Sequence, residues 1–204
     1  MATMVMPPDR FQAIIARRRR YGHDSHDEVW NGVYVMSPEA DNSHQHLAFT
    51  IAKIIDLAIS RKGAVVYPGV NVSDQVDDWT RNYRVPDIAV FMPGNPAENR
   101  ETHFLGGPDF LVEVVSKYDR SRRKLDFYAS VGVREVLFVN RDPWRLDLYK
   151  LGDGKLELAA TSRPDGAIAI ESDVLGLSFR LEPSKPRPRI EVDDVLSGAH
   201  WTIS

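Results

Sequence analysis

The fold is decided by PDFLVEVVS (residues 108–116), an apolar strand with one carboxylate, Glu113, inside it. A second stretch of the same kind, YRVPDIAVFM (83–92), precedes it and carries Asp87. A carboxylate within an apolar strand loses its hydration, which costs several kcal/mol unless the group is paired or bound to a metal. For either residue alone, pairing with an arginine or with backbone N–H groups is the simpler interpretation. Two of them on consecutive strands favour a shared site in one sheet.

Helices and further strands surround these two stretches and predict an α/β (α+β) domain with a central mixed sheet flanked by helices. In the clearest helix, apolar residues from Leu47 onward recur every three or four positions, Ser43 is the expected N-cap, and Gly63 suits its end. Asn31-Gly32 suits the turn of a two-stranded ribbon over 28–37. The other expected elements are helices at 8–20 and 117–132 and strands at 64–72, 134–140, 144–151, 155–161, 167–172 and 177–182.

The whole chain, residues 1–204, is expected to form a single domain. Within it, we distinguish an N-terminal helical arm (1–27), a core (28–151), a β-rich extension on the C-terminal side (152–182) and a tail (183–204). The tail is rich in proline and charge, so we expect it to wrap the surface or fray.

The composition excludes several classes of protein. The chain has 26 Lys and Arg against 29 Asp and Glu, and no cysteine, which excludes disulfides, thiolate zinc sites and cysteine nucleophiles. No stretch approaches the roughly 18 apolar residues of a membrane span, and no secretory signal is readable. We therefore expect a cytoplasmic protein that does not bind membranes. The net charge of −3 argues against a nucleic-acid binder that uses its whole surface.

A metal ion is one way to stabilise the two strand carboxylates. Two acidic groups held close together repel one another unless a proton or a divalent cation neutralises them. Since the chain has no cysteine, oxygen ligands from Asp87 and Glu113 favour Mg²⁺ or Mn²⁺ over a soft metal.

Lys124 is the strongest basic candidate. It ends the basic run KYDRSRRK (117–124) and, at helical spacing, shares a face with Tyr128, so it points toward the sheet. Beside a carboxylate pair, a lysine stabilises a phosphate or helps to activate a water. The alternatives are a structural ion pair with Glu113 and a lysine that buries only its stem.

Three other features are weaker candidates. Glu28 precedes the ribbon and His44 lies at the start of the clearest helix. The run HDSHDE (23–28) resembles a metal cluster by composition, but its spacing matches no ligand pattern, and we interpret it as a polar loop. For the run Arg17 to Arg20, a solvated helix end is favoured over a phosphate-contacting arm.

Taken together, the motifs resemble a restriction-endonuclease family of the PD-(D/E)xK nuclease superfamily that is catalogued as a domain of unknown function. They span roughly residues 28–151 in the expected order, although each is weak by itself. The motifs are EVWNGVYVMSP at 28–38, the SHQ-initiated helix from Ser43, VPD at 85–87, EVVS at 113–116, and KLDFYASVGVRE at 124–135, which continues into LFVNRDPWRLDLYKL.

The resemblance implies specific site residues. Asp87 and Glu113 would be metal-binding carboxylates, and Val114 would contribute its backbone carbonyl. Glu28 would be a further metal ligand or would orient a water. The lysine that the superfamily carries two residues after the glutamate is replaced here by Val115, and Lys124 stands in the matching position on the following helix. If Lys124 does not fill that role, Lys117 is the fallback.

The function implied by the resemblance is metal-dependent hydrolysis of DNA phosphodiester bonds, with Mg²⁺ or Mn²⁺ as cofactor, DNA as partner and a homodimer as a possible assembly. Two alternatives stay open. Because Val115 replaces the usual lysine, the chain could be a catalytically inactive nucleic-acid-binding or regulatory module of the same fold. The strand carboxylates could also be structural ion pairs in a protein-interaction domain.

Overall fold

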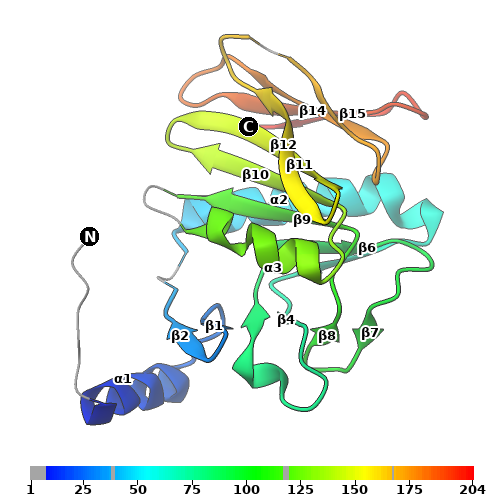
Figure 1. Cartoon of the computed structure of the whole chain (residues 1–204). Coiled ribbons are helices and arrows are strands. Elements are labelled where there is room, and N and C mark those ends of the chain that lie inside the picture. Colours follow the sequence, from blue (N-terminus) through cyan, green and yellow to red (C-terminus); the bar gives the residue numbers. More distant parts are fainter. Residues whose placement is uncertain (1–7, 38–39, 117–119, 167) are drawn as a thin grey trace.

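A six-stranded mixed sheet forms the centre of the structure (Figure 1). The computed structural model describes residues 8–37, 40–116, 120–166 and 168–204, with 8–11 described as backbone only. The strand order is β12–β11–β10–β9–β6–β3, and all neighbours are antiparallel except β9 and β10, which are parallel. The strands are β3 (Val65–Pro68), β6 (Ile88–Phe91), β9 (Phe110–Val115), β10 (Glu135–Arg141), β11 (Trp144–Gly152) and β12 (Lys155–Ser162). The predicted central mixed sheet is confirmed.

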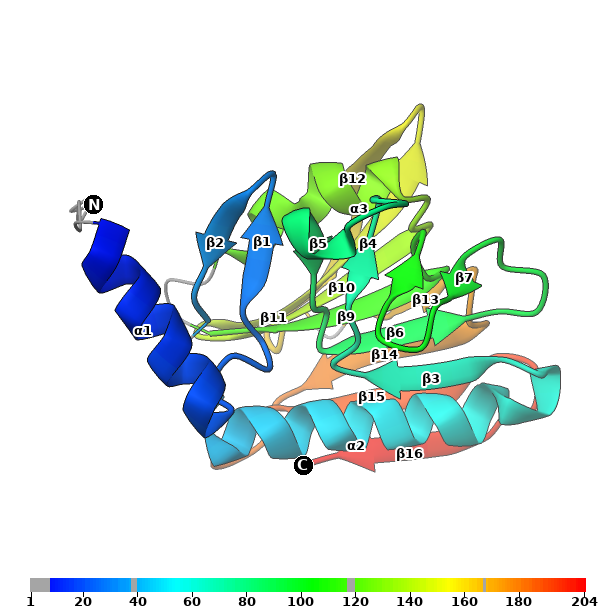
Figure 2. The same cartoon turned by 90° about the horizontal axis from the view of Figure 1, so that it is seen from below.

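Helices cover both faces of this sheet, as predicted (Figures 1 and 2). Helix α2 (Asn42–Ile59) packs on one face, where Val114 belongs to its core cluster. Helix α3 (Leu125–Ser130) packs on the other face, where Val115 belongs to the second cluster. Because alternate strand residues point to opposite faces, Glu113 lies on the α3 face together with Val115.

The ends of α2 are set by local hydrogen bonds. Asp41, not the predicted Ser43, is the N-cap, and its carboxylate accepts a hydrogen bond of 2.7 Å from the backbone N–H of His44. At the other end, a 3₁₀ turn η1 (Ser60–Lys62) leads to Gly63, whose φ of 75° is the left-handed conformation that glycine adopts readily. The predicted end of the helix is therefore confirmed, and its predicted cap is wrong.

A second, smaller sheet takes up residues that were predicted to belong to longer strands. The predicted strands 64–72 and 83–92 each divide between the two sheets, because the chain turns at Gly69 (φ 59°) and because Pro86 cannot donate a ladder hydrogen bond. The order is β2–β1–β5–β4–β8–β7. Its strands are β1 (Glu28–Trp30), β2 (Val33–Val35), β4 (Val72–Ser73), β5 (Tyr83–Arg84), β7 (Glu98–Asn99) and β8 (Phe104–Leu105), with the 3₁₀ turn η2 (Trp79–Arg81) before β5.

The C-terminal residues form a third sheet, so the tail from 183, expected to wrap the surface or fray, contributes two paired strands. The sheet has the order β13 (Ile170–Ser172), β14 (Leu177–Glu182), β15 (Arg189–Asp194), β16 (His200–Ile203). Ile190 and Val192 alternate with polar residues and join the core on the α2 side. The predicted boundaries also fall between paired strands, because β11 pairs with β12 and β14 pairs with β15.

The predicted helix over 117–132 is shorter than expected in the part that the structure describes. Residues 117–119 lie outside the described residues. From Ser121 the chain forms a 3₁₀ turn, η3 (Ser121–Lys124), which continues into α3. The chain leaves this helix at Gly132, whose φ is 86°. Tyr128 and Lys124 are both buried, which confirms that this face of the helix points toward the sheet.

The N-terminal helix α1 (Pro8–Tyr21) is fastened beside the small sheet by an ion pair between the half-buried Arg18 and the buried Asp27. Arg18 donates to both oxygens of Asp27, at 2.6 and 2.7 Å, and to the carbonyl of Ser37 at 2.9 Å. Asp27 also accepts from the Tyr34 hydroxyl at 2.6 Å. Arg18 is therefore a structural residue. None of the described helices is long and apolar enough to span a bilayer.

We predict that Asp27→Asn destabilises the protein at neutral pH by about 3 kcal/mol, because it leaves Arg18 without its buried partner. Burial alone would raise the pKa of Asp27, but hydrogen bonds from Arg18, Tyr34 and Ser37 outweigh it and lower this pKa. The stabilisation is therefore present above the ordinary aspartate pKa of about 3.9 and is lost as the pH falls through the lower folded-state pKa. Urea unfolding at pH 7 and at acidic pH measures both effects.

The matched control is Asp24→Asn, since Asp24 lies 3.9 Å from the mostly exposed Arg19 and its loss is expected to change stability by less than about 0.5 kcal/mol. Equal losses for the two variants would contradict the role given to Asp27.

Candidate active site

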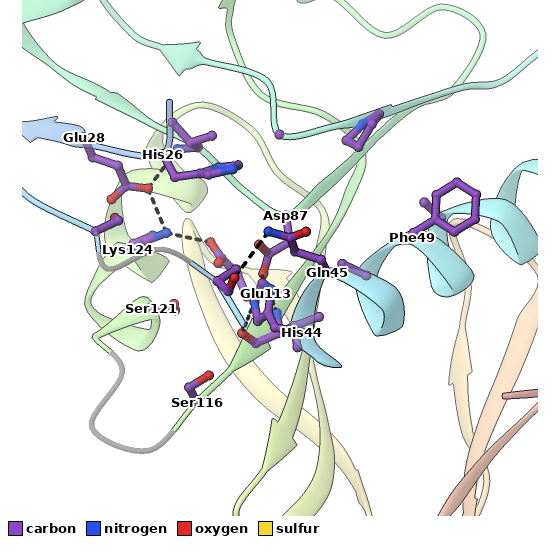
Figure 3. Close-up of a pocket in the computed structure, with 18 of the residues that line it drawn as sticks. His26, Glu28, His44, Gln45, Phe49, Asp87, Glu113, Ser116, Ser121 and Lys124 are labelled. Carbon is purple, nitrogen blue, oxygen red and sulfur yellow. Dashed lines mark hydrogen bonds and ion pairs between the residues drawn. The ribbon is translucent and has the colours of Figure 1, made fainter. Parts of the chain in front are cut away.

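The candidate residues line one cavity of about 1210 Å³, bordered by α2, the β1–β2 ribbon and η3. Glu28, Asp87, Glu113 and Lys124 all contribute to its wall, and so does Val114. Figure 3 shows that Glu28, Lys124 and Glu113 form a row joined by ion pairs, with His44 next to Asp87. The structure thus brings together residues that lie far apart in the sequence.

Lys124 lies between two carboxylates. Its Nζ is 2.8 Å from Glu28 Oε1 and 3.0 Å from Glu113 Oε1, and all three side chains are buried. Burial alone would lower the pKa of Lys124, but Glu113 and Glu28 outweigh it and raise the pKa above its usual range. The lysine is therefore held as a charged ammonium group at the base of the cavity.

Glu113 accepts a second strong hydrogen bond from a residue that the sequence placed only on the buried face of its helix. The Tyr128 hydroxyl donates to Glu113 Oε1 at 2.5 Å. Burial raises the pKa of Glu113 to about 7, with opposition from Lys124 and reinforcement from the nearby Asp87 and Glu28 carboxylates. The cavity therefore carries an excess of negative charge that favours a bound proton or cation.

Both carboxylate oxygens of Glu28 accept hydrogen bonds or ion pairs from other residues of the chain. Oε1 accepts from Lys124 and from the backbone N–H of Val85 at 2.8 Å, and Oε2 accepts from the Trp30 indole N–H at 2.6 Å. These contacts make Glu28 a group that positions the lysine. They do not favour the additional metal-ligand role that the resemblance implied.

Asp87 lies where the pairing between β6 and β9 ends. β6 and β9 pair as far as Ile88 opposite Val112. Two residues further, the same register sets Val114 against Pro86, which has no N–H to donate. The Val114 carbonyl therefore receives no ladder hydrogen bond from Pro86, and the Val114 N–H donates to Asp87 Oδ2 at 2.7 Å. Asp87 and the main chain of Val114 are therefore held together at this edge.

His44 reaches the same edge from the first turn of α2. Its Nε2 lies 2.9 Å from the Val114 carbonyl oxygen and 3.4 Å from Asp87 Oδ2. Burial alone would lower the pKa of His44, but Asp87 and the Val114 carbonyl outweigh it and raise the pKa. The sequence marked His44 only by its place at a helix start, so this contact with Asp87 and Val114 was not foreseen.

A clamp also missed by the sequence fixes the start of α2 to the sheet. Arg141, at the end of β10, donates to both oxygens of Asp41 at 2.9 and 3.0 Å and to the Ser116 hydroxyl at 2.5 Å. Because Asp41 caps the helix through His44, this clamp holds His44 close to the end of β9.

The superfamily's usual lysine position is filled by an apolar side chain, as the sequence indicated. Val115 is buried in the core beneath α3, on the same face as Glu113. Lys124 brings an ammonium group to Glu113 from η3 instead. The fallback Lys117 lies outside the described residues.

The donor chemistry fits a hard divalent cation. Asp87 and Glu113 supply carboxylate oxygens, Val114 supplies a main-chain carbonyl oxygen, and all three line the cavity. Across the ranges that the structure describes, no three His, Asp or Glu side chains are grouped closely enough to hold a metal. A metal site here therefore has to include the main-chain oxygen.

The run at 23–28 does not form a metal cluster: Asp27 pairs with Arg18 and Glu28 with Lys124.

Comparisons with known proteins identify the family and the fold of the chain. Residues 15–182 match a family named Uma2, with the description "Putative restriction endonuclease". The structure is similar to the crystal structure of a "putative nuclease belonging to DUF820" from Anabaena variabilis ATCC 29413, with a TM-score of 0.58 and 14% identity, covering 73% of this chain and 82% of that one. No curated protein matches.

We predict that Lys124→Met lowers the free energy of unfolding by about 3–5 kcal/mol, because it leaves two buried carboxylates without their shared cation. Thermal and urea unfolding of the purified variant measures the loss. Lys53→Met is the matched control, since Lys53 lines the same cavity but is exposed, and its removal is expected to cost less than about 0.5 kcal/mol. A Lys124→Met protein as stable as the wild type would show that the ion pairs do not hold the site together.

Proposed function

Because the chain belongs to the Uma2 family, described as "Putative restriction endonuclease", we propose that it is an endonuclease that hydrolyses phosphodiester bonds of DNA with Mg²⁺ or Mn²⁺. The observation that carries this proposal is the charged Lys124 held against Glu113 in the cavity that Asp87 also lines. A buried ammonium group beside strand carboxylates suits phosphodiester hydrolysis, since charge develops on the phosphate.

Three groups would hold the cation: the carboxylates of Asp87 and Glu113 and the carbonyl of Val114. Both Lys124 and Tyr128 bind Oε1 of Glu113, so among the described residues Oε2 accepts no hydrogen bond and is the oxygen available to a cation. When bound, a divalent cation lowers the pKa of a water and polarises the phosphate.

Lys124 would act on the phosphate directly. Its two ion pairs use two of the three ammonium hydrogens, which leaves the third for a ligand in the cavity that Lys124 lines. From there it would donate to a phosphate oxygen and stabilise the charge that develops during in-line displacement. Glu28 would orient this ammonium group, with Val85 and Trp30 keeping the carboxylate in place.

DNA would contact the rim of the cavity through a small number of basic groups. Lys53 and Arg120 line the cavity, and the last turn of α1 adds exposed arginines near Ser37, which also lines it. With a net charge of −3, we expect local contacts and an affinity for DNA that falls as the salt concentration rises.

The test is cleavage of supercoiled plasmid and of single-stranded DNA with Mg²⁺ or Mn²⁺, with a chelator as the blank. We expect Asp87→Asn, Glu113→Gln and Lys124→Met each to lower the rate at least about 100-fold, because each removes a group that stabilises the transition state. Glu98→Gln is the control, since Glu98 forms an exposed ion pair with Arg100 on β7.

The same assay separates the alternatives. Wild-type rates in Asp87→Asn and Glu113→Gln would contradict the site. Binding of DNA without cleavage by the wild-type protein, with either metal, would favour the catalytically inactive nucleic-acid-binding module. Loss of stability in Glu113→Gln, with no metal-dependent property in the wild type, would favour the structural ion pairs of an interaction domain.

A further inference from the structure

Three potential ligand atoms meet where the pairing of β9 with β6 ends, and one of them is a nitrogen. They are Asp87 Oδ2, the Val114 carbonyl oxygen and His44 Nε2, which lies 3.4 Å from the first and 2.9 Å from the second. Asp87 Oδ2 is also 2.7 Å from the Val114 amide nitrogen, which ties the carboxylate to the same peptide. Two side chains and one main-chain oxygen thus form a compact set.

Their spacing is that of neighbouring ligands on one cation. Adjacent ligands at right angles around an octahedral ion with bonds of about 2.1 Å lie about 3 Å apart. The His44 distances of 2.9 and 3.4 Å bracket this value. In the absence of a cation, the same ring nitrogen is placed to donate a hydrogen bond to the Val114 carbonyl.

The ring is held at this position by the protein. His44 lies in the first turn of α2, and its backbone N–H is bound by the cap Asp41. Arg141 donates hydrogen bonds to both oxygens of Asp41 and to the hydroxyl of Ser116, which lies two residues beyond Val114. The helix start and the strand end therefore move as one unit, which keeps His44 aligned with the carbonyl.

We propose that His44 is a metal ligand of this site, so that one imidazole nitrogen joins the oxygen ligands proposed above. The inference rests on the proposed function for the presence of a cation and adds the identity of a donor. Composition favoured oxygen ligands alone. An imidazole adds affinity for first-row transition ions, so the site prefers Mn²⁺ to Mg²⁺ more strongly than an all-oxygen site would.

The competing explanation is that His44 only braces α2 against β9 through its hydrogen bond to Val114. His44→Gln separates the two roles, because the glutamine amide keeps a hydrogen-bond donor and removes the imidazole. Two histidines serve as controls: His46, which is exposed on the same helix, and His26, which lines the same cavity. Each is changed to Gln as well.

The experiment measures Mn²⁺ and Mg²⁺ binding by calorimetry, and the pulsed EPR spectrum of bound Mn²⁺ in protein with natural or ¹⁵N-labelled histidine. We expect nitrogen coupling from one histidine in the wild type, which changes on labelling and disappears in His44→Gln but not in the controls. Mn²⁺ affinity is expected to fall at least about tenfold in His44→Gln, and Mg²⁺ affinity to fall less.

Each result decides between the two proposals. Mn²⁺ bound by the wild type, lost in Asp87→Asn, yet without nitrogen coupling and unchanged in His44→Gln, overturns the role of His44 and leaves the metal-dependent nuclease standing. No Mn²⁺ or Mg²⁺ binding by the wild type overturns both. The coupling needs no variant to be seen, so a His44→Gln protein that fails to fold does not weaken the test.

Discussion

The site depends on burying one ammonium group. A charge removed from water is tolerated only when oppositely charged partners surround it, and Lys124 takes its partners from two different sheets. Glu28 belongs to β1 of the small sheet and Glu113 to β9 of the central sheet. The ion pairs therefore fix how the small sheet lies against the central sheet and where η3 crosses between them. Tyr128 and Val85 strengthen the arrangement by occupying further lone pairs of the same carboxylates.

The strand β9 contributes a side chain and a main-chain group to two different parts of the site. Its side chain at Glu113 points to the α3 face, where the ammonium and phenol groups lie. Its main chain at Val114 points along the plane of the sheet, toward Asp87 and His44. Side chains leave a strand perpendicular to its backbone hydrogen bonds. The side chain of one residue and the main chain of the next can therefore contact groups on different elements. The Glu113 carboxylate thereby lies against Lys124 and the Asp87 carboxylate against His44.

Much of this could be predicted from local sequence. Asp87 and Glu113 stood out because a carboxylate in an apolar strand needs a partner, and Lys124 stood out because helical spacing placed it with Tyr128. The contact of His44 could not be predicted, since it depends on where a helix begins relative to a sheet edge. The ribbon at 28–37 was predicted, but the rest of the small sheet was not, because strands of two residues, such as Val72–Ser73, show no periodicity in the sequence. The last two strands were hidden by the prolines before Arg189, although Ile190 and Val192 alternate as strand residues do.

The position of Lys124 on a helix has a consequence for recognising such proteins. Val115 and Lys124 are nine positions apart in the chain, yet both belong to the face of the sheet that carries Glu113. The ammonium group can thus reach one place in space from two places in the sequence. A search for a linear motif, which requires lysine two residues after the glutamate, passes over this chain, whereas a search for the spatial arrangement of the charged atoms finds it. Such a site is defined by the spatial arrangement of its atoms in the folded chain and not by the order of its residues in the sequence.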